Sequence, residues 1–499
     1  MNVDLTAGGS RGGTRLDPRA WTALILLCAA NFMVILDSQA VILAAPTIAK
    51  SLKMTPSAAQ WVISANLITF GGLLLLGGRA ADLLGRRRLF LIGTALFLVV
   101  SLVSGLASNG EVLITARALH GVATAMMAPT ALSILTTTFP EGRGRNKALA
   151  AWQGIAGLGA TAALIIGGEL VDHFGWRWIF LMNVPVAVAM LLAGPVLLTE
   201  SRDLSVGRKY DVAGALTSTA ALLLIVYAVT KAPDNGWTGS KTLGMFGGAA
   251  ALFVLFAIIE SRMESPLVPM RILRSGALVG GNLATVAIGM AVFGLSLCAA
   301  EYAQGGLSYT TLQYGVKGSP LPAMALISAF AGQRLIGRFG SRRVVAVCAL
   351  LLIGGSLLLV QAVENGGSYG SIFAGLAVFG TGLGLGTTAC SAAALSGIAR
   401  RDAGLASGFN AAAFQIGGSF GIAAVTTVIV SHSVGASQQA AMTAGFKAGF
   451  VATAYFGAAA LLLALIVIPG LRRSREAERA ALAAQADQEV RDAGSVSVN

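Results

Sequence analysis

Charged side chains are scarce in this 499-residue chain. Only 11% of its residues are Asp, Glu, Lys or Arg, whereas 55% are hydrophobic. Soluble domains carry roughly a quarter charged residues, so this chain has too little charge to cover a water-facing surface. Its mean hydropathy is +0.76. The shortage excludes an ordinary soluble globular protein and predicts a chain whose main solvent is lipid.

Cysteine and histidine are also rare, with four and three residues. The cysteines all fall in apolar runs, at Cys28, Cys298, Cys348 and Cys390. This placement argues against a disulfide framework, and the scattered Cys and His residues offer no metal site. No Walker phosphate loop occurs, so ATP is not expected to drive the protein directly. A loose GxGxxG-like spacing in 380–386 lies inside an apolar run, where it indicates helix packing rather than dinucleotide binding. No cofactor is therefore expected.

Long apolar runs dominate the rest of the chain. A bilayer needs roughly 20 apolar residues per helix, and about fourteen segments qualify. The first contains Asp37 and is too long for the apolar core of a cleavable signal, so we expect it to remain as a span. The predicted fold class is an all-α polytopic membrane protein. The segments lie near residues 21–46, 58–78, 89–108, 112–136, 148–168, 178–199, 212–231, 241–260, 276–299, 312–333, 344–363, 371–397, 405–430 and 448–470.

Lys and Arg are distributed unevenly between the loops. Of the 35 in the chain, 27 fall in the two terminal segments and in every second loop between them. Cytoplasmic loops carry the excess of Lys and Arg, so we expect both termini in the cytoplasm. The formal charge of +13 is therefore interpreted as a topology signal. Nucleic acid is not expected as a partner.

A short basic sequence occurs twice, at Gly78–Arg88 and at Gly332–Arg343. Aligning Gly85 with Gly340 offsets the copies by 255 residues, which is eight predicted spans. A plain duplication of six helices would separate them by six, so we predict two six-helix bundles with two further helices inserted between them. The predicted parts are a cytoplasmic segment 1–20, the N-terminal bundle 21–199, the inserted helices with their loops 200–275, the C-terminal bundle 276–470, and a cytoplasmic tail 471–499 that begins as a short surface helix.

Several motifs resemble those of one transporter family. Besides the basic repeat, they are Leu36–Pro46, Arg117–Gly121 with Pro129, Trp176–Pro185, and Ala403–Asn410 with Gln415–Gly418. Together, in this order, they resemble the fourteen-helix drug:proton antiporter branch of the major facilitator superfamily, over about Ala30 to Leu471. The resemblance implies a major facilitator fold. It also implies two bundles that rock around a central cavity and expose it to either side in turn.

The chain departs from this family pattern in four places. Ala163 and Leu164 replace a Gly-Pro pair in the fifth span, although the small residues Gly159 and Gly167, followed by Gly168, still permit close helix packing. The other three departures are Ile42 where the family usually has Asn, Asn66 where it usually has Tyr, and His120 where it usually has Gln. Positions 42 and 66 often face the cavity in the family. We therefore expect Asn66 to contribute to substrate choice.

Ionisable residues inside apolar spans are the candidates for proton coupling. An ionised carboxylate at bilayer depth costs about 2.5–3.5 kcal/mol on insertion scales, so Asp37 must be protonated, paired or wetted. Arg117 lies at similar depth and is the expected partner, and His120 follows one turn later on the same face. We expect Asp37 to exchange a proton and Arg117 to tune it, although a fixed structural ion pair is the alternative. For His120, a neutral hydrogen-bonding role and a proton relay both remain open.

Two further ionisable residues mark the predicted outer mouth. Glu301 ends the ninth span and Lys317 begins the tenth. They could pair as an outer gate, engage substrate, or simply be solvated at the membrane interface.

The first basic repeat is the predicted conformational latch. Glycines there permit a sharp turn and close backbone approach. Asp82 can sit near a helix N-terminus and pair with a basic side chain across the bundles. The resemblance implies that this loop favours one access state, whereas topology alone explains the arginines but not Asp82. The residues of the latch are Gly78, Asp82, Gly85, Arg86 and Arg87.

These observations predict a proton-coupled secondary transporter that exports amphiphilic organic compounds such as drugs, dyes or antibiotics, and not an enzyme. Its partners would be that substrate, protons and the lipid bilayer. Its predicted location is the bacterial inner membrane. A dedicated exporter of one metabolite or antibiotic made by the host is the first alternative. A receptor or scaffold that transports nothing is the alternative of a different class, and it predicts no proton flux dependent on substrate.

Overall fold

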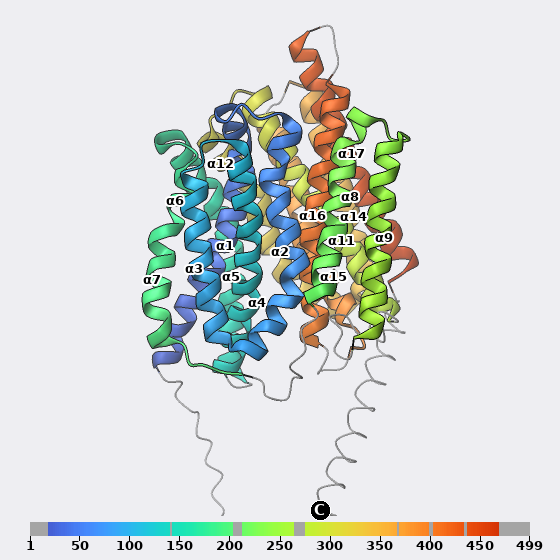
Figure 1. The fold of residues 1–499 in the computed structure, drawn as a ribbon. Helices are drawn as coiled ribbons and strands as arrows, with labels where there is room; N and C mark the ends of the chain where they lie inside the picture. Colours follow the sequence, from blue (N-terminus) through green and yellow to red (C-terminus); the bar gives the residue numbers. More distant parts are fainter. Residues whose placement is uncertain are drawn as a thin grey trace, which may run out of the picture.

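Helices account for the regular structure of this chain. The computed structural model describes residues 18–468, apart from 140–141, 203–211, 264–274, 367–368, 399–402 and 434–436. Within these ranges there is no strand, and long helices stand side by side (Figure 1). The predicted N-terminal segment up to residue 17 and the tail helix after 471 lie outside the described residues.

The first seven helices form one bundle. Within it α2 and α3 both pack on α4, α1 packs on α5, and α7 packs on α3 and α1. The side chains of Thr55 and Asn109 accept a backbone hydrogen bond at the start of α2 and α4, which gives these helices defined N-termini. The helices are α1 (Pro18–Ser51), α2 (Pro56–Leu84), α3 (Arg86–Gly105), α4 (Gly110–Thr138), α5 (Arg143–Phe174), α6 (Trp178–Leu181) and α7 (Asn183–Leu197).

A second bundle repeats this packing scheme. Its contacts α13–α15, α14–α15, α11–α16 and α14–α17 correspond to α2–α4, α3–α4, α1–α5 and α3–α7 of the first. The internal repeat therefore extends from one loop to the helix packing of both bundles. The elements are α11 (Gly276–Glu301), the π-helix η1 (Tyr302–Gly306), α12 (Thr311–Gly318), α13 (Pro320–Phe339), α14 (Ser341–Glu364), α15 (Tyr369–Leu395), α16 (Ala403–His432) and α17 (Gln438–Ile466).

Two helices lie outside both bundles. They are α8 (Val212–Asn235) and α9 (Ser240–Arg262), which pack on each other at one side of the molecule (Figure 1). Helix α8 also contacts α2 of the first bundle and α16 of the second. The predicted boundaries near residues 200 and 275 fall beside 203–211 and 264–274, outside the described residues.

Twelve helical segments in the described residues are long and apolar enough to cross a membrane. The two remaining predicted segments are also helical. One is α8, whose apolar part is Leu216–Ala232, and the other comprises α12 and α13, which are separated at Ser319. The structure thus confirms a polytopic all-helical fold.

Two glycine turns define one end of the molecule. Gly85 joins α2 to α3 and Gly340 joins α13 to α14, with φ angles of 105° and 82°. A residue with a Cβ rarely adopts these angles, which explains glycine at both sites. We call this end, which is the lower one in Figure 1, the basic end, and the opposite end the far end. The end of α17 also lies at the basic end, where the carbonyl of Leu465 accepts a hydrogen bond from the Arg342 side chain.

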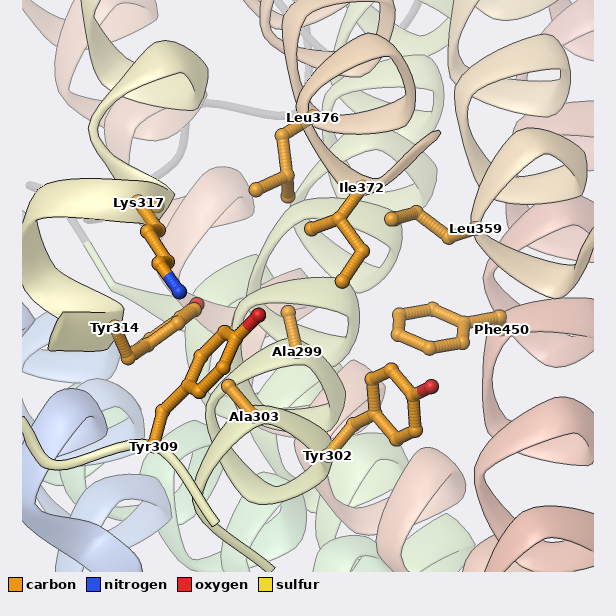
Figure 2. A pocket seen from close by; sticks show the side chains of 11 residues that line it. Ala299, Tyr302, Ala303, Tyr309, Tyr314, Lys317, Leu359, Ile372, Leu376 and Phe450 are labelled. Carbon is orange, nitrogen blue, oxygen red and sulfur yellow. The ribbon is translucent and has the colours of Figure 1, made fainter. Parts of the chain in front are cut away.

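The bundles meet along α2–α16, α1–α11 and α5–α12. At the far end, the C-terminal bundle encloses a small hollow lined by Lys317, several tyrosines and apolar side chains (Figure 2). Helix α12 lies between this hollow and α5 of the other bundle. Any separation of the bundles at the far end must therefore move α12 away from α5.

Candidate functional site

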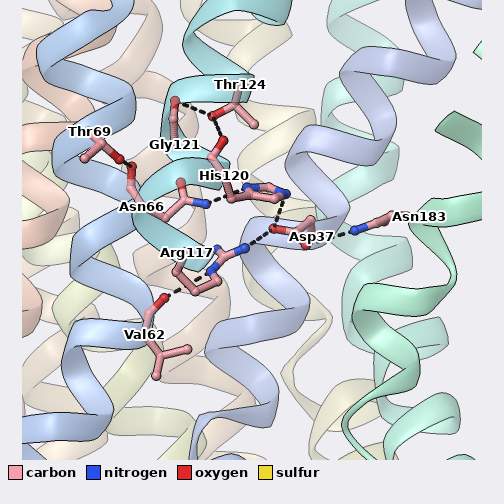
Figure 3. Close-up of polar contacts among 9 residues, drawn as sticks. All are labelled: Asp37, Val62, Asn66, Thr69, Arg117, His120, Gly121, Thr124 and Asn183. Carbon is pink, nitrogen blue, oxygen red and sulfur yellow. Dashed lines mark hydrogen bonds and ion pairs between the residues drawn. The ribbon is translucent and has the colours of Figure 1, made fainter. Parts of the chain in front are cut away.

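Asp37 lies at the centre of a polar cluster inside the N-terminal bundle (Figure 3). Its side chain is 0% exposed. Its Oδ2 accepts a hydrogen bond from Arg117 Nη1 at 2.7 Å, and its Oδ1 accepts one from Asn183 Nδ2 at 3.0 Å. His120 Nε2 lies 3.5 Å from the same Oδ2. Helices α1, α4 and α7 thus supply the carboxylate and the three side chains around it.

Arg117 is held on a second side. Its Nε donates to the carbonyl of Val62 in α2 at 3.1 Å, and its guanidinium carbon lies 5.7 Å from the Phe180 ring centroid. The side chain is 1% exposed, so the ion pair with Asp37 is removed from solvent. Such a pair is tolerated in low dielectric only when hydrogen bonds satisfy both partners, and the bonds from Asn183 and to Val62 do this.

The orientation of His120 follows from Asn66. The Asn66 Nδ2 lies 2.8 Å from His120 Nδ1. An amide nitrogen only donates, so Nδ1 accepts and a neutral ring carries its proton on Nε2. That nitrogen is buried without a hydrogen bond and faces Asp37. The imidazole ring also packs against Phe97, with centroids 4.6 Å apart. The geometry therefore directs an N–H group at the carboxylate.

Sequence reasoning placed Arg117 and His120 beside Asp37 and missed Asn183. The signal was present, because Asn183 lies in the quoted motif Trp176–Pro185. The helix break at Met182 puts Asn183 in the first turn of α7, facing the cluster. Asn66, which we expected to affect substrate choice, joins this cluster and is 1% exposed.

The C-terminal bundle contains a neutral polar cluster near the basic end. Asn410 Nδ2 donates to Asn282 Oδ1 at 3.1 Å and to Thr285 Oγ1 at 2.8 Å, and Asn410 Oδ1 accepts from Ser391 Oγ at 2.7 Å. It joins α11, α15 and α16, and none of these four side chains is ionisable.

Glu200 is the acidic partner of the first basic repeat. Its carboxylate accepts from the backbone nitrogens of Arg87 and Arg88 at 3.1 and 3.2 Å, so it caps the start of α3. A Cβ added to Gly85 would meet this carboxylate at 2.7 Å, a second reason for glycine there. Sequence reasoning missed Glu200 because it lies 113 residues from Arg87.

Equivalent arginines in the two basic repeats make equivalent hydrogen bonds. Arg87 Nη1 donates to the carbonyls of Pro195 and Leu198 at the end of α7, at 3.3 and 3.4 Å. Arg342, which is 255 residues later, donates to the carbonyl of Leu465 at the end of α17. Each arginine thus binds the last carbonyls of the final helix in its own bundle, where a cation also favours the helix dipole.

The remaining latch residues are placed as follows. Asp82 lies on α2, but its side chain is outside the described part of the structure. Arg86 donates its backbone N–H to Ser201 O at 3.1 Å. Gly78 lies loosely against Pro129, whereas a Cβ on its neighbour Gly77 would meet the Ala125 carbonyl oxygen at 2.0 Å. Gly77 therefore lies in close contact with α4, and the latch role stays a prediction.

The three glycines predicted for helix packing lie on two faces of α5. Gly159 and Gly167 lie against α1, near Phe32 and Ala40. Gly168 faces the other bundle, where an added Cβ would meet the Leu312 Cα at 2.7 Å. On α12, a Cβ on Gly315 would meet the Leu164 carbonyl oxygen at 2.0 Å. The far-end contact between bundles thus requires glycine on both helices.

Glu301 and Lys317 lie at the far end, but no ion pair between them occurs in the described part of the chain. The Lys317 ammonium instead lies 3.6 Å from the Tyr309 ring centroid. Glu301 is half-buried at the junction of α11 and η1. One turn later, Gln304 Nε2 donates to the carbonyl of Leu43 in α1 at 2.8 Å. This places the Glu301 segment beside the N-terminal bundle.

The chain is similar to known membrane transporters. Residues 27–422 match the family model described as the Major Facilitator Superfamily. Among solved structures, a bacterial homolog of the human lysosomal transporter Spinster, in an inward-facing and unoccupied conformation, has a TM-score of 0.63 at 15% identity. That similarity covers 92% of this chain and 98% of the other. The transporter PepTSo of the POT family gives a TM-score of 0.63 at 14% identity, with coverage of 92% and 98%.

Curated relatives include resistance and export proteins. The puromycin resistance protein of Streptomyces alboniger is 33% identical over 90% of this chain and 91% of its own. The cephamycin export protein of Amycolatopsis lactamdurans is 33% identical over 94% and 96%. The tetracenomycin C resistance and export protein of Streptomyces glaucescens is 33% identical over 85% and 78%.

Proposed function

Since this chain belongs to the Major Facilitator Superfamily, and is therefore a multi-pass membrane transporter rather than an enzyme, we propose that it exports amphiphilic organic compounds in exchange for protons. The named relatives support export of antibiotics or drugs. The buried Asp37 cluster supports the proton coupling. Contacts between the bundles at the far end support alternating access.

Asp37 is the observation that carries the coupling. In this state it is ionised and paired with Arg117 at 2.7 Å. When a proton reaches Asp37, the carboxyl becomes neutral and Arg117 remains as a buried charge without its counterion. That arrangement is costly in low dielectric, so protonation favours a rearrangement of α1 against α4. Arg117 keeps its own proton and acts only by tuning Asp37.

His120 is positioned to donate a hydrogen bond to Asp37. Its Nε2–H faces Asp37, while Asn66 fixes the ring from the other side.

We propose that substrate occupancy and Asp37 protonation compete, so that substrate release outside coincides with proton uptake. Each elementary charge that moves down a potential of 100 mV supplies about 2.3 kcal/mol, to which any pH gradient adds.

We further propose that fourteen helical segments cross the membrane. Helix α8 has 24 residues and α13 has 20, which correspond to about 36 and 30 Å at 1.5 Å per residue. Both lengths suffice for a hydrocarbon core of about 30 Å. The distribution of Lys and Arg supports a cytoplasmic location of the basic end and of both termini in a bacterial cell, with the far end outside.

A transport assay tests this proposal. Inverted vesicles carrying the protein are energised until their lumen is acidic, and puromycin, cephamycin or a lipophilic dye is added. Exchange releases luminal protons, which a pH-sensitive dye in the lumen reports. We expect Asp37→Asn to abolish the signal. Glu169→Gln, which changes a half-exposed carboxylate on α5, is the control and should retain it.

Three results would contradict or narrow this proposal. Release of protons by Asp37→Asn at the wild-type rate would show that Asp37 does not couple transport to protons. Proton release by one compound only would favour a dedicated exporter. No proton release by any compound with the wild-type protein would favour the receptor or scaffold.

A further inference from the structure

We propose that the hollow at the far end of the C-terminal bundle binds the acidic group of an aromatic organic anion, with Lys317 as its cationic partner. The role of this site in substrate release rests on the proposed export function, whereas the binding itself does not. Lys317 lies in the last turn of α12, where the helix dipole also favours a cation, so the groups around it carry the argument.

Tyrosines gather around Lys317. The whole chain has seven tyrosines. Tyr302, Tyr309 and Tyr314 line the hollow with Lys317, and a fourth, Tyr369, has its ring centroid 5.6 Å from the ammonium. Figure 2 shows the ammonium directed toward the ring of Tyr309 and the hydroxyl of Tyr314. Four of the seven tyrosines thus lie on this hollow or against its lysine.

The polar groups of this cluster lack protein partners in the described ranges. Lys317 forms no ion pair and no hydrogen bond there, and the four tyrosine hydroxyls form no hydrogen bond. An ammonium has three N–H donors and each phenol has one. Lys317 is half-buried, and Figure 2 shows the Tyr302 hydroxyl directed away from it. A carboxylate or another oxyanion beside Lys317 provides the acceptor that the ammonium and the nearby Tyr314 hydroxyl lack.

The charge of the ligand follows from the same contacts. Aromatic faces of this kind attract cations, but Lys317 already occupies the face of Tyr309. A second cation would be repelled by the ammonium, whereas an anion is attracted. The nearby acid Glu301 is not among the residues that line the hollow.

The rest of the wall is apolar. Leu359, Ile372, Leu376 and Phe450 lie opposite Tyr309 and Tyr314 and come from α14, α15 and α17 (Figure 2). Such a surface suits a hydrocarbon or aromatic body rather than a hydrated inorganic anion. The ligand class is therefore an amphiphilic organic acid whose ring packs against these side chains.

The hollow is narrow in this conformation, with room for about one water molecule. Its α12 wall is held against α5 by the close contact of Gly315 with Leu164. When the bundles separate at the far end, α12 loses this support and the hollow can widen. The site would then accept substrate in the state that releases it outside.

The test uses the purified full-length protein in nanodiscs of phosphatidylcholine. The probes are 2-naphthoate and 2-naphthamide, which share a ring system and differ in charge. We expect the wild-type protein to bind the carboxylate about tenfold more tightly than the amide, a difference that Lys317→Gln removes and Lys317→Arg preserves. Equal affinity of the wild-type protein for both probes overturns the proposal, as does an unchanged preference in Lys317→Gln.

Three further measurements complete the test. Tyr309→Phe keeps the ring under Lys317 and removes one hydroxyl, so a partial loss of the preference is expected even if Lys317→Gln folds poorly. Repeating the titration in phosphatidylglycerol discs identifies the source of the anion, since competition there supports the same chemistry with a lipid headgroup as occupant. Finally, the control variant Glu169→Gln should bind 2-naphthoate normally. Because this binding is measured without a proton gradient, a failure of this site and a failure of proton coupling are distinguishable.

Discussion

Asp172 of α5 caps α12 across the boundary between the two bundles, with its Oδ1 3.0 Å from the Thr311 backbone nitrogen. Its Oδ2 accepts from the Leu312 nitrogen at 2.9 Å, while Thr310 of the same turn caps the Gln313 nitrogen. The first N–H groups of α12 are thus satisfied partly by the other bundle. A carboxylate at a helix N-terminus is also favoured by the helix dipole. In the alternating access proposed above, Asp172 therefore stabilises the closed far end and releases α12 when that end opens.

Replacing Asp172 by Ala should shift the protein toward a state that is open at the far end. Two charge-assisted hydrogen bonds between the bundles are lost, each worth about 1.5–3 kcal/mol. Spin labels at the exposed positions Phe174 on α5 and Val316 on α12 report this separation directly. We expect a longer and broader distance distribution in the variant than in the parent protein.

Glu169→Ala is the matched control for this measurement. Glu169 lies on the same helix three residues before Asp172, and its carboxylate pairs with His173 rather than with α12. Its distance distribution should equal that of the parent protein. If Asp172→Ala also leaves the distribution unchanged, Asp172 does not hold the far end closed.

The stability of the folded protein should depend more on charge balance in the Asp37 cluster than on either charge alone. Arg117→Gln leaves a fully buried carboxylate without its counterion, which costs about 3–5 kcal/mol. The double variant Asp37→Asn with Arg117→Gln removes both charges, so the yield and thermal stability of folded protein should recover. Proton-coupled transport should not recover. A double variant no more stable than Arg117→Gln would contradict the assigned ion pair.

His120 should act as a hydrogen-bond donor that stays neutral. In His120→Gln, the side-chain amide can still donate toward Asp37 and accept from Asn66, so proton-coupled transport should fall by no more than about threefold. His120→Leu keeps the volume but offers neither group, and transport should be lost. If His120→Gln is as inactive as His120→Leu in the vesicle assay, the imidazole itself relays the proton.

The helical fold was largely predictable because a lipid environment permits few backbone structures. Every predicted span is helical, since backbone groups in hydrocarbon must be satisfied within their own segment. The spacing of Gly85 and Gly340 predicts two inserted helices between the bundles, and this division of the chain stays a prediction. Breaks within predicted spans were not foreseen. The separations at Met182 and Ser319 depend on packing against other helices, which hydropathy does not report.

The site was predictable where the chemistry allowed few partners. Asp37 needs a buried cation, and Arg117 is at the same depth. Asn183 and Glu200 could not be paired with their partners in the same way. A neutral amide in an apolar run has many possible neighbours, and Glu200 reaches the start of α3 only through the fold of the whole bundle. The contact of Asp172 with α12 depends on how the two bundles meet.

Residues of the basic repeats should have two different roles. Arg87 and Arg342 stabilise the ends of helices, whereas Asp82 acts in the conformational latch. Arg87→Ala and Arg342→Ala each remove a cation from the last carbonyls of α7 and α17, so each should cost about 1 kcal/mol of stability. Asp82→Asn, in contrast, should slow transport and leave the amount and thermal stability of folded protein unchanged. Thermal unfolding of the three purified variants, measured beside vesicle transport, checks both expectations. If Asp82→Asn lowers thermal stability as much as Arg87→Ala does, Asp82 stabilises the fold as Arg87 does and the latch role is wrong.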